Sequence, residues 1–506
     1  MKRFLSSVAA VGVALFGIVA IPNATAATTT LNMGVLTDIK DWQASSAQLS
    51  NFGPYYQAVY DTLLGANSDG SVKPALATSW SYSSGNKVLT LNLRSDVKFS
   101  NGEAFNAAAA AKNLLAFSKG LSPNASTGAN IVSASADGGN ANVLKIKLGK
   151  ADPSFLAYLS QSLGFMQAPS TIGTAAAVST PVGSGPFILD KASSVSGATY
   201  VFKANPNYWD AANRKFSELN LKVLATPAAA VNAIKAGQVD VVTILDNTSV
   251  ASLKASGLAV DSQQLNWVGI VFVDKAGRMG SPLKDVRVRQ AINYGIDRAA
   301  ALQVMGAGYG VPTTQVFAKY NRGYVASLDN AYPFSIDKAK SLLKDAGYPN
   351  GFKIEMPLNG ALNPAVGQFI KDSLEKIGII VNYTSFASGS DFFAAVQAPK
   401  YAMFRQGLER NPNSWTLLQF LLARDSAWNP SGYGDATSDK LISRIAHASG
   451  DVQTKLFEQL NTYIVRQAWH APLYASDNYV AYKAANVKVK LHAGNSTPFL
   501  SDISPA

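Results

Sequence analysis

Two strand–helix–strand patterns, far apart in the chain, constrain the fold more than any other feature. The first spans residues 221–242 and has an alanine-rich helix that Gly237 ends. The second spans residues 354–383, where apolar residues recur at helical spacing and Gly378 ends the helix. Two strands joined by a helix favour a parallel pair with a right-handed crossover. We therefore predict two separate α/β units.

A helix pair is predicted between these two patterns, in the stretch 283–312, which reads LKDVRVRQAINYGIDRAAALQVMGAGYGVP. Asp285 and Asp297 are natural N-caps for two successive helices, and Gly306 would end the second one. The chain has 506 residues, of which 47% are hydrophobic and 15% charged. That length and composition indicate a globular protein of more than one domain.

Several kinds of chemistry are excluded by residues that the sequence lacks. There is no cysteine, which excludes disulfides, thiolate nucleophiles and Cys-based metal sites. The histidines His447, His470 and His492 are well separated and have no metal or triad spacing. No G-x-S-x-G or H-E-x-x-H motif is present. We therefore expect no metal site, no cofactor, no catalytic residue and no enzymatic activity.

The N-terminus has the pattern of a signal peptide over residues 1–26. Lys2 and Arg3 precede an apolar run over 8–21, and Ala24-Thr25-Ala26 is a typical cleavage site. A lipidated form would need a cysteine at the cleavage point. We therefore expect export and cleavage near Ala26, which would give a periplasmic or secreted protein that behaves as a monomer.

The basic charge of the chain is diffuse. The formal net charge is +12, or +10 without Lys2 and Arg3, and no run of five Lys or Arg residues occurs. Such a charge could favour anionic partners, but nucleic-acid proteins concentrate it on one element. We predict no nucleic-acid partner.

Several segments, in a fixed order, resemble one known family. They include PALATSW…LTLNLRSDVKFSNGEAF (74–105), GSGPFILDKASSVSGATYVFKANPNYW (183–209), AAAVNAIKAGQVDVV (228–242) and DVRVRQAINYGIDR (285–298). Together these segments resemble the family 5 extracytoplasmic solute-binding proteins, the peptide-, dipeptide- and nickel-binding receptors of ABC importers. The resemblance implies an α/β, two-lobed periplasmic-binding-protein fold of type II with an extra subdomain in lobe one.

The same resemblance implies a division of the mature chain into lobes. Lobe one would be discontinuous and lobe two continuous, with the chain crossing between them near 265–274 and again near 475–486. The predicted segments are 1–26 signal peptide, 27–58 lobe one, 59–179 extra subdomain of lobe one, 180–264 lobe one, 265–484 lobe two and 485–506 lobe one. A small solute or peptide would bind between the lobes, and the closed form would deliver it to a membrane permease.

A ligand site is implied around FRQGLERNPNSW (404–415), which is similar to the cleft motif of the family, roughly G-W-x-A-D-Y-P-D-P. The acid of that motif pairs with the ligand amine in peptide receptors, and Glu409 takes its place here. The stretch departs from the pattern, because Arg410 replaces an aromatic residue and one extra residue precedes the proline. A guanidinium suits carboxylate or phosphate groups, so Arg405 and Arg410 leave open the possibility that the solute is anionic. These three residues could instead pair with one another on a solvated loop.

Aromatic residues near the predicted crossings are further candidates for the ligand site. Trp267, Trp415 and Tyr474 could form its walls, although a residue of this kind is more often part of a core than in contact with a ligand. Asp38 and Trp42 fall in the loop after the first strand, which faces the cleft in the resembled family.

Three other functions stay open from the sequence. The same fold could bind an anionic small molecule, an oligosaccharide or a metal chelate. A periplasmic hydrolase is a rival of another class, which a turnover assay would separate from a binding protein. A receptor that serves a sensor, or that acts as a chaperone, would have the same sequence features.

Overall fold

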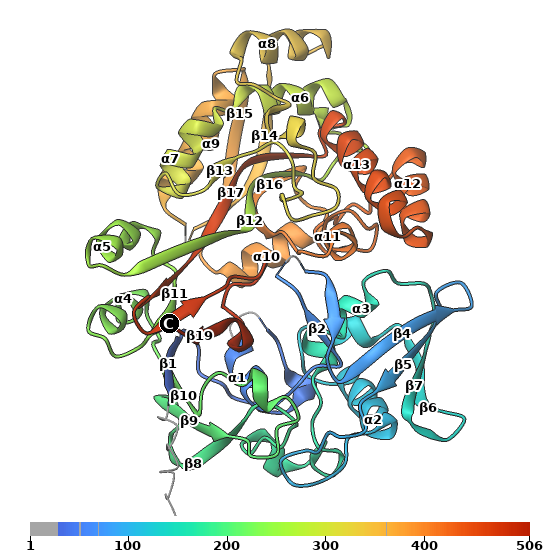
Figure 1. Cartoon of the computed structure of the whole chain (residues 1–506). Coiled ribbons are helices and arrows are strands. Elements are labelled where there is room, and N and C mark those ends of the chain that lie inside the picture. The colour runs from blue at the N-terminus through green and yellow to red at the C-terminus, as the bar shows by residue number, and fades with distance from the viewer. Residues whose placement is uncertain (1–28, 50–51, 69, 361) are drawn as a thin grey trace, which may run out of the picture.

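A computed structural model describes residues 29–49, 52–68, 70–360 and 362–506. The predicted signal peptide and its cleavage site lie outside these residues. The chain forms two lobes, one above the other in Figure 1, as predicted. In the described part of the chain, no helix is both long enough and apolar enough to cross a lipid bilayer.

One mixed sheet runs through both lobes. Two long antiparallel strands, β12 (Ala259–Phe272) and β17 (His470–Tyr482), form its middle and pass from one lobe into the other (Figure 1). On the lobe-two side, β12 pairs with β16 (Met403–Glu409). On the lobe-one side, β17 pairs with β11 (Val241–Ile244). These two strands are thus the only crossings that the described sheet provides between the lobes.

The rest of this sheet builds lobe one. Beyond β11 its order is β1 (Thr30–Val35), β10 (Glu218–Val223), β9 (Thr199–Ala204) and β8 (Phe187–Val195). The predicted strand–helix–strand unit is β10, α4 (Pro227–Lys235) and β11, and Thr226 caps the helix. Both strands run parallel to β1, which lies between them. The crossover therefore passes over a third strand, because the N-terminal segment inserts into the sheet.

The extra subdomain of lobe one contains a four-stranded antiparallel sheet covered by a helix. Its strand order is β4 (Ala77–Ser83), β5 (Val88–Leu93), β7 (Asn140–Leu148) and β6 (Ile131–Asp137). Helix α2 (Ala107–Phe117) begins after Asn106, whose side chain accepts the Ala109 amide. Buried Leu89, Leu91 and Leu114 belong to the core that joins them. A short hairpin, β2 (Leu64–Ala66) and β3 (Val72–Pro74), and the short helix α3 (Phe155–Tyr158) lie toward lobe two (Figure 1).

Lobe two packs helices on both faces of its part of the large sheet. Alternate residues of β12 explain this, because Val268 and Ile270 enter one core while Trp267 and Val271 enter another. The predicted helix pair is α6 (Val286–Gly295) and α7 (Arg298–Gly306), capped by Asp285 and Asp297 as expected. The second predicted unit is β14 (Phe352–Asn359), α9 (Pro364–Glu375) and β15 (Ile379–Phe386), with its two strands parallel. The remaining helices are α8 (Ile336–Asp345), α10 (Gly389–Gln397), α11 (Ser414–Leu421), α12 (Ala436–His447) and α13 (Gly450–Arg466).

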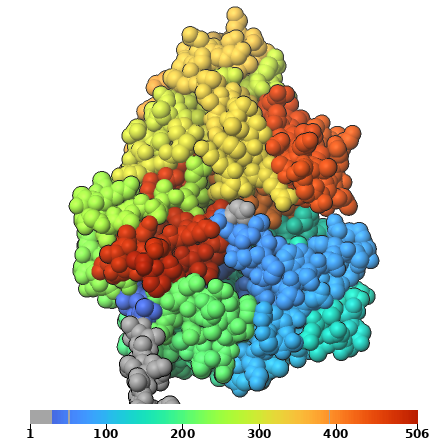
Figure 2. Space-filling model, in the orientation of Figure 1, coloured from blue at the N-terminus to red at the C-terminus, as the bar shows by residue number. Residues whose placement is uncertain are grey.

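The C-terminal segment returns to lobe one. After β17 it forms β18 (Val487–Val489) and β19 (Ile503–Pro505). Val487 and Ile503 belong to the hydrophobic core that also contains the buried residues of β1. Figure 2 shows this segment in red beside the blue N-terminal part of lobe one, directly below lobe two. The Ala493 amide donates to the carbonyl of Ser68 at 3.0 Å, which ties the two parts together. The segment boundaries given above stay a prediction.

Candidate functional site

A cavity of about 490 Å³ lies between the two lobes. Its size is within the range of small-molecule sites. Lobe one supplies Gln48, Leu49, Pro123, Asn124, Thr127, Tyr158, Gln161, Ser162, Leu163, Leu245, Gly494, Asn495 and Ser496, lobe two supplies Leu265, Asn266, Glu409, Asn411, Pro412 and Thr416, and the crossing strand β17 supplies Asn478. Because both lobes contribute walls, the shape of this cavity depends on how far the lobes close.

The two crossing strands form the inner wall of this cavity. Asn266 on β12 and Asn478 on β17 both line it. Asn266 faces the cavity because its neighbour Trp267 points into the lobe-two core, and side chains alternate along a strand. Asn478 is held in place by its amide, which donates to the carbonyl of Ser496 at 2.7 Å. The wall therefore offers two amide groups, of which that of Asn478 is held in place, where the strands cross between the lobes.

Glu409 is the last residue of β16, where it pairs with Asn266. Its side chain opens on the cavity rather than into a core. The Glu409 side chain is exposed to the cavity, yet the protein that surrounds the cavity raises its pKa above the ordinary value, because that surrounding disfavours the charged form. Within the described residues, no side chain forms a hydrogen bond or ion pair with this carboxylate. It is therefore available to a ligand.

Glu409 is also the only charged side chain among the described residues that line this cavity. Most of the other polar groups are amides, contributed by Gln48, Asn124, Gln161, Asn266, Asn411, Asn478 and Asn495. Amides both donate and accept, so they suit neutral polar groups of many shapes. A single carboxylate in an amide-rich cavity can hold one cationic group through a charge-assisted hydrogen bond. In the described residues, no cluster of three or more His, Asp or Glu side chains could hold a metal ion.

A second interlobe cavity, of about 420 Å³, lies on the other side of Pro412. Trp415 and Arg322 are among its lining residues. Direct hydrogen bonds join the lobes beside it: Ser154 Oγ donates to Asn413 Oδ1 at 2.8 Å and accepts from Thr416 Oγ1 at 2.8 Å. We call this arrangement, in which the two lobes are in direct contact, the closed form.

The two predicted arginines lie away from the 490 Å³ cavity. Arg405 precedes Glu409 by four residues on β16, which places it roughly 13 Å along the strand. It is directed toward Tyr474 inside lobe two, and burial lowers its pKa. Arg410 is buried and donates to the Gln315 carbonyl at 2.9 Å and to Gln264 Oε1 at 3.0 Å. The alternative of ion pairs among these three residues on a solvated loop does not hold for this described segment, because residues 403–409 form a strand.

The predicted aromatic walls are mostly core residues. Trp267 is fully buried and meets His470 edge-on, with 5.3 Å between ring centroids. Tyr474 is buried beside Gly306 in the other core of lobe two. Trp415 lies 8% exposed and lines the 420 Å³ cavity. Of the three, only Trp415 borders the cleft, and its contact with a ligand stays a prediction.

Asp38 and Trp42 lie in lobe one and line neither interlobe cavity. Trp42 is buried against Tyr55, with 5.6 Å between ring centroids, and against Tyr200 at 5.7 Å. Asp38 accepts the Tyr200 hydroxyl at 2.6 Å and pairs with Lys40. Burial opposes its charge, but these two hydrogen bonds outweigh burial and lower its pKa. The loop therefore stabilises lobe one, contrary to the expectation that it faces the cleft.

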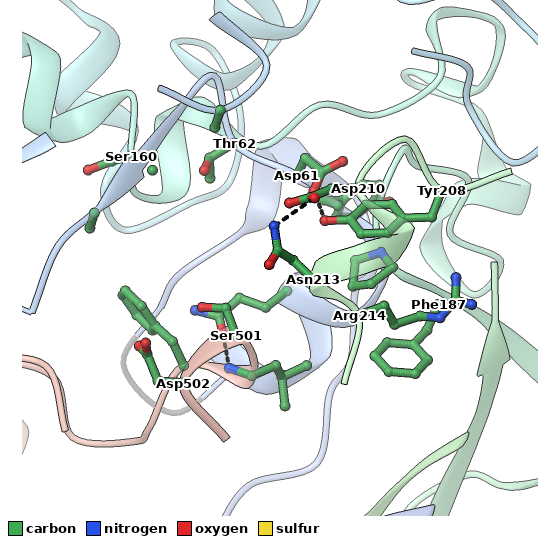
Figure 3. A pocket seen from close by; sticks show the side chains of 18 of the residues that line it. Asp61, Thr62, Ser160, Phe187, Tyr208, Asp210, Asn213, Arg214, Ser501 and Asp502 are labelled. Carbon is green, nitrogen blue, oxygen red and sulfur yellow. Dashed lines mark hydrogen bonds between the residues drawn. The ribbon is translucent and has the colours of Figure 1, made fainter. Parts of the chain in front are cut away.

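A third cavity, of about 510 Å³, lies within lobe one (Figure 3). Asp61 points into it beside Tyr208 and Asp210. Burial raises the pKa of Asp61 to about 7, yet its carboxylate accepts Trp209 Nε1 at 2.9 Å and the Tyr208 hydroxyl at 3.2 Å. This carboxylate thus holds the 205–209 loop against helix α1 (Gly53–Val59) and needs no ligand.

Sequence reasoning missed the amides that surround Glu409. Gln161, Asn478 and Asn495 come from three distant segments and carry no local motif. Of these amides, only that of Asn266 could have been predicted from the sequence. Side chains alternate along a strand, so Asn266 points away from the core that its neighbour Trp267 enters.

Comparison with known proteins assigns the family. Residues 71–427, more than half of the chain, match the bacterial extracellular solute-binding proteins, family 5. The chain belongs to this family. The resemblance inferred from the sequence segments is therefore confirmed, and the family is one of binding proteins rather than enzymes.

Individual relatives are more distant. The chain is 27% identical to heme-binding protein A of Haemophilus influenzae over 65% of either chain. It is 26% identical to the glutathione-binding protein GsiB of Escherichia coli K12 over 66% of this chain and 65% of that protein. The matches thus span less than two thirds of the length of these relatives. The solved structure of HbpA2 from Haemophilus parasuis has a TM-score of 0.83 at 22% identity and covers 94% of this chain and all of that one, which supports the fold.

Proposed function

We propose that this protein is the substrate-binding component of an ABC importer, and that it captures a small solute with a cationic amine between its lobes. The observation that supports this most directly is Glu409, an unpaired carboxylate in an amide-lined interlobe cavity of about 490 Å³. Closure around the solute would create the surface that a membrane permease reads.

A short peptide with a free amino terminus is the solute class that we infer first. Its ammonium group would bind Glu409, and its peptide groups would bind the surrounding amides, which match their donors and acceptors. The family membership and the glutathione-binding relative are consistent with a peptide-like solute. A non-peptide amine would satisfy the same carboxylate and is the second candidate.

An anionic solute fits this cavity poorly. No Lys or Arg side chain is among the described residues that line it, and Arg405 and Arg410 point elsewhere. A carboxylate or phosphate placed beside Glu409 would meet a like charge in a partly desolvated site. This argument also applies to a metal chelate that carries net negative charge.

A peptide library tests the proposal. The purified protein is heated with a mixture of free di- and tripeptides, and separately with the same mixture after N-acetylation. A ligand that binds only the folded state raises the melting temperature, and a concentration of 100 times Kd adds about 2.7 kcal/mol. We expect a shift with the free peptides and almost none with the acetylated ones.

Polyamines and small dicarboxylates serve as comparison ligands in the same assay. A shift with polyamines alone would favour the second candidate. Equal shifts with free and acetylated peptides, or a shift with dicarboxylates alone, would contradict the amine proposal.

A further inference from the structure

Pro412 of lobe two fits between two glycines that belong to different parts of lobe one. Gly70 is in the β2–β3 hairpin, and Gly494 is in the C-terminal segment. A Cβ atom added to Gly494 would stand 2.4 Å from Pro412 Cδ, and one added to Gly70 would stand 2.9 Å from Pro412 Cβ. Both distances are far below van der Waals contact. The lobes therefore reach this arrangement only because neither position carries a side chain.

Pro412 is also the wall between the two interlobe cavities. It lines both of them, whereas Gly494 lines the 490 Å³ cavity and Gly70 lines the 420 Å³ cavity. The contact with the two glycines closes the gap through which these cavities would otherwise join. The same contact therefore sets the outer limit of the space around Glu409.

Lobe two holds the backbone of Pro412 rigidly. Asn321 Nδ2 donates to the carbonyls of Asn411 and Pro412, at 2.8 and 3.0 Å. The Tyr320 hydroxyl donates to the Arg410 carbonyl at 2.8 Å. The buried Arg410 guanidinium is fixed by the Gln315 carbonyl at 2.9 Å. A proline braced in this way cannot move aside without breaking buried hydrogen bonds.

We propose that Pro412 is a positioning residue, whose contact with Gly70 and Gly494 determines how far the lobes close and where Glu409 meets the solute. The inference rests on the proposed function in one respect: its consequence is that the bound solute is confined to the 490 Å³ cavity. The contact itself is a property of the two lobes and can be tested without any ligand.

A cysteine pair across the lobes measures closure directly. Ser154 Oγ and Thr416 Oγ1 are 2.8 Å apart in the closed form, so Ser154→Cys with Thr416→Cys would bring two thiols within reach of a disulfide. The natural chain has no cysteine, which makes this pair the only one present. Under a mild oxidant, the cross-linking rate is proportional to the fraction of molecules that are closed, even where closure is transient.

Two glycine substitutions in this background test the contact. We expect Gly494→Ala to slow cross-linking about tenfold or more, which corresponds to about 1.4 kcal/mol against closure. Gly257→Ala is the matched control, because Gly257 is also in lobe one, with φ +79° against +71° for Gly494, but has no neighbouring atom within 4 Å. It adds the same backbone strain without the clash, so its rate should stay within about twofold of the parent.

A crossed rescue identifies Pro412 as the partner. Pro412→Ala removes Cδ and Cγ, the atoms nearest to Gly494, but keeps the Cβ that faces Gly70. It should therefore restore much of the cross-linking lost in Gly494→Ala and little of that lost in Gly70→Ala.

Three results would overturn the proposal: a parent pair that does not cross-link, a Gly494→Ala rate equal to that of Gly257→Ala, or equal rescue of both glycine variants. None of these results depends on the solute, so the amine proposal could fail in the peptide assay while this inference stands, or the reverse.

Discussion

The interlobe cavity and the cavity within lobe one are nearly equal in volume, at about 490 and 510 Å³, and each contains a carboxylate whose pKa is raised by burial. They differ in what that carboxylate binds. Asp61 accepts hydrogen bonds from Tyr208 and Trp209, whereas Glu409 has no side-chain partner among the described residues. Cavity volume therefore does not distinguish the candidate ligand site from the other cavity. The difference lies in the carboxylates, because only that of Glu409 lacks side-chain hydrogen-bond partners.

The walls of the two cavities differ as well. Lobe one supplies every described residue around Asp61, so that cavity should keep its shape as the lobes move. Both lobes supply the walls around Glu409. Of these two cavities, only the one around Glu409 can couple the binding of a solute to closure, as the proposed function requires.

The largest expected effect is a loss of solute affinity when Glu409, rather than Asp61, is substituted. Glu409→Gln keeps the shape of the side chain and removes its charge. A buried ammonium left without its partner costs about 2–5 kcal/mol, so affinity for an amine solute should fall roughly 30- to 4000-fold. Calorimetry measures the affinity, and the melting temperature of the free protein should stay nearly unchanged. Wild-type affinity in this variant would show that Glu409 is not the anchor.

The reverse pattern is expected for the lobe-one carboxylate. Asp61→Ala leaves the Tyr208 hydroxyl and Trp209 Nε1 without acceptors, and an unsatisfied buried group costs about 1–3 kcal/mol. Urea unfolding should show this loss of stability, while solute affinity stays within about twofold. A variant that keeps its stability but loses binding would place a ligand in the lobe-one cavity and break the comparison.

The pH dependence of binding sharpens the comparison further. An ammonium solute binds the ionised form of Glu409, whose pKa is raised by burial. Affinity should therefore be full above that pKa and fall about tenfold for each pH unit below it. Calorimetry from pH 8 down to pH 4 measures the profile, and Glu409→Gln should remove it. A profile that persists in Glu409→Gln would assign the titration to another group.

The smallest effect is expected for Arg405. Its Cα atom lies roughly 13 Å along β16 from that of Glu409, and its side chain is directed toward Tyr474, so Arg405→Gln should change solute affinity less than about threefold. Calorimetry with the same solute measures this value. Loss of binding in Arg405→Gln, with Glu409→Gln unaffected, would instead indicate an anionic solute.

Local signals predicted the fold well. Both strand–helix–strand units formed, and Asp285 and Asp297 cap helices because their short side chains reach backbone amides of the first turn. What local signals missed was the insertion of β1 between β10 and β11, which depends on a pairing between residues almost two hundred positions apart.

The site was predicted less completely, for a physical reason. Glu409 was placed in the cleft by its motif, and it lines the interlobe cavity. Trp267 and Tyr474 were candidates because they lie near the crossings, and Trp42 because its loop faces the cleft in the resembled family, yet large aromatic side chains are as useful in a core as at a ligand. Which face of a strand meets the cleft is decided by the packing of the other lobe, and no single segment encodes it.

Native mass spectrometry of protein purified gently from its own cells tests the central claim most directly. The account predicts a co-purified solute that carries a primary or secondary amine, shown by its reaction with an amine-specific reagent after release. The same preparation of Glu409→Gln should carry little of it. A solute without any cationic group, retained equally by both proteins, would contradict the account.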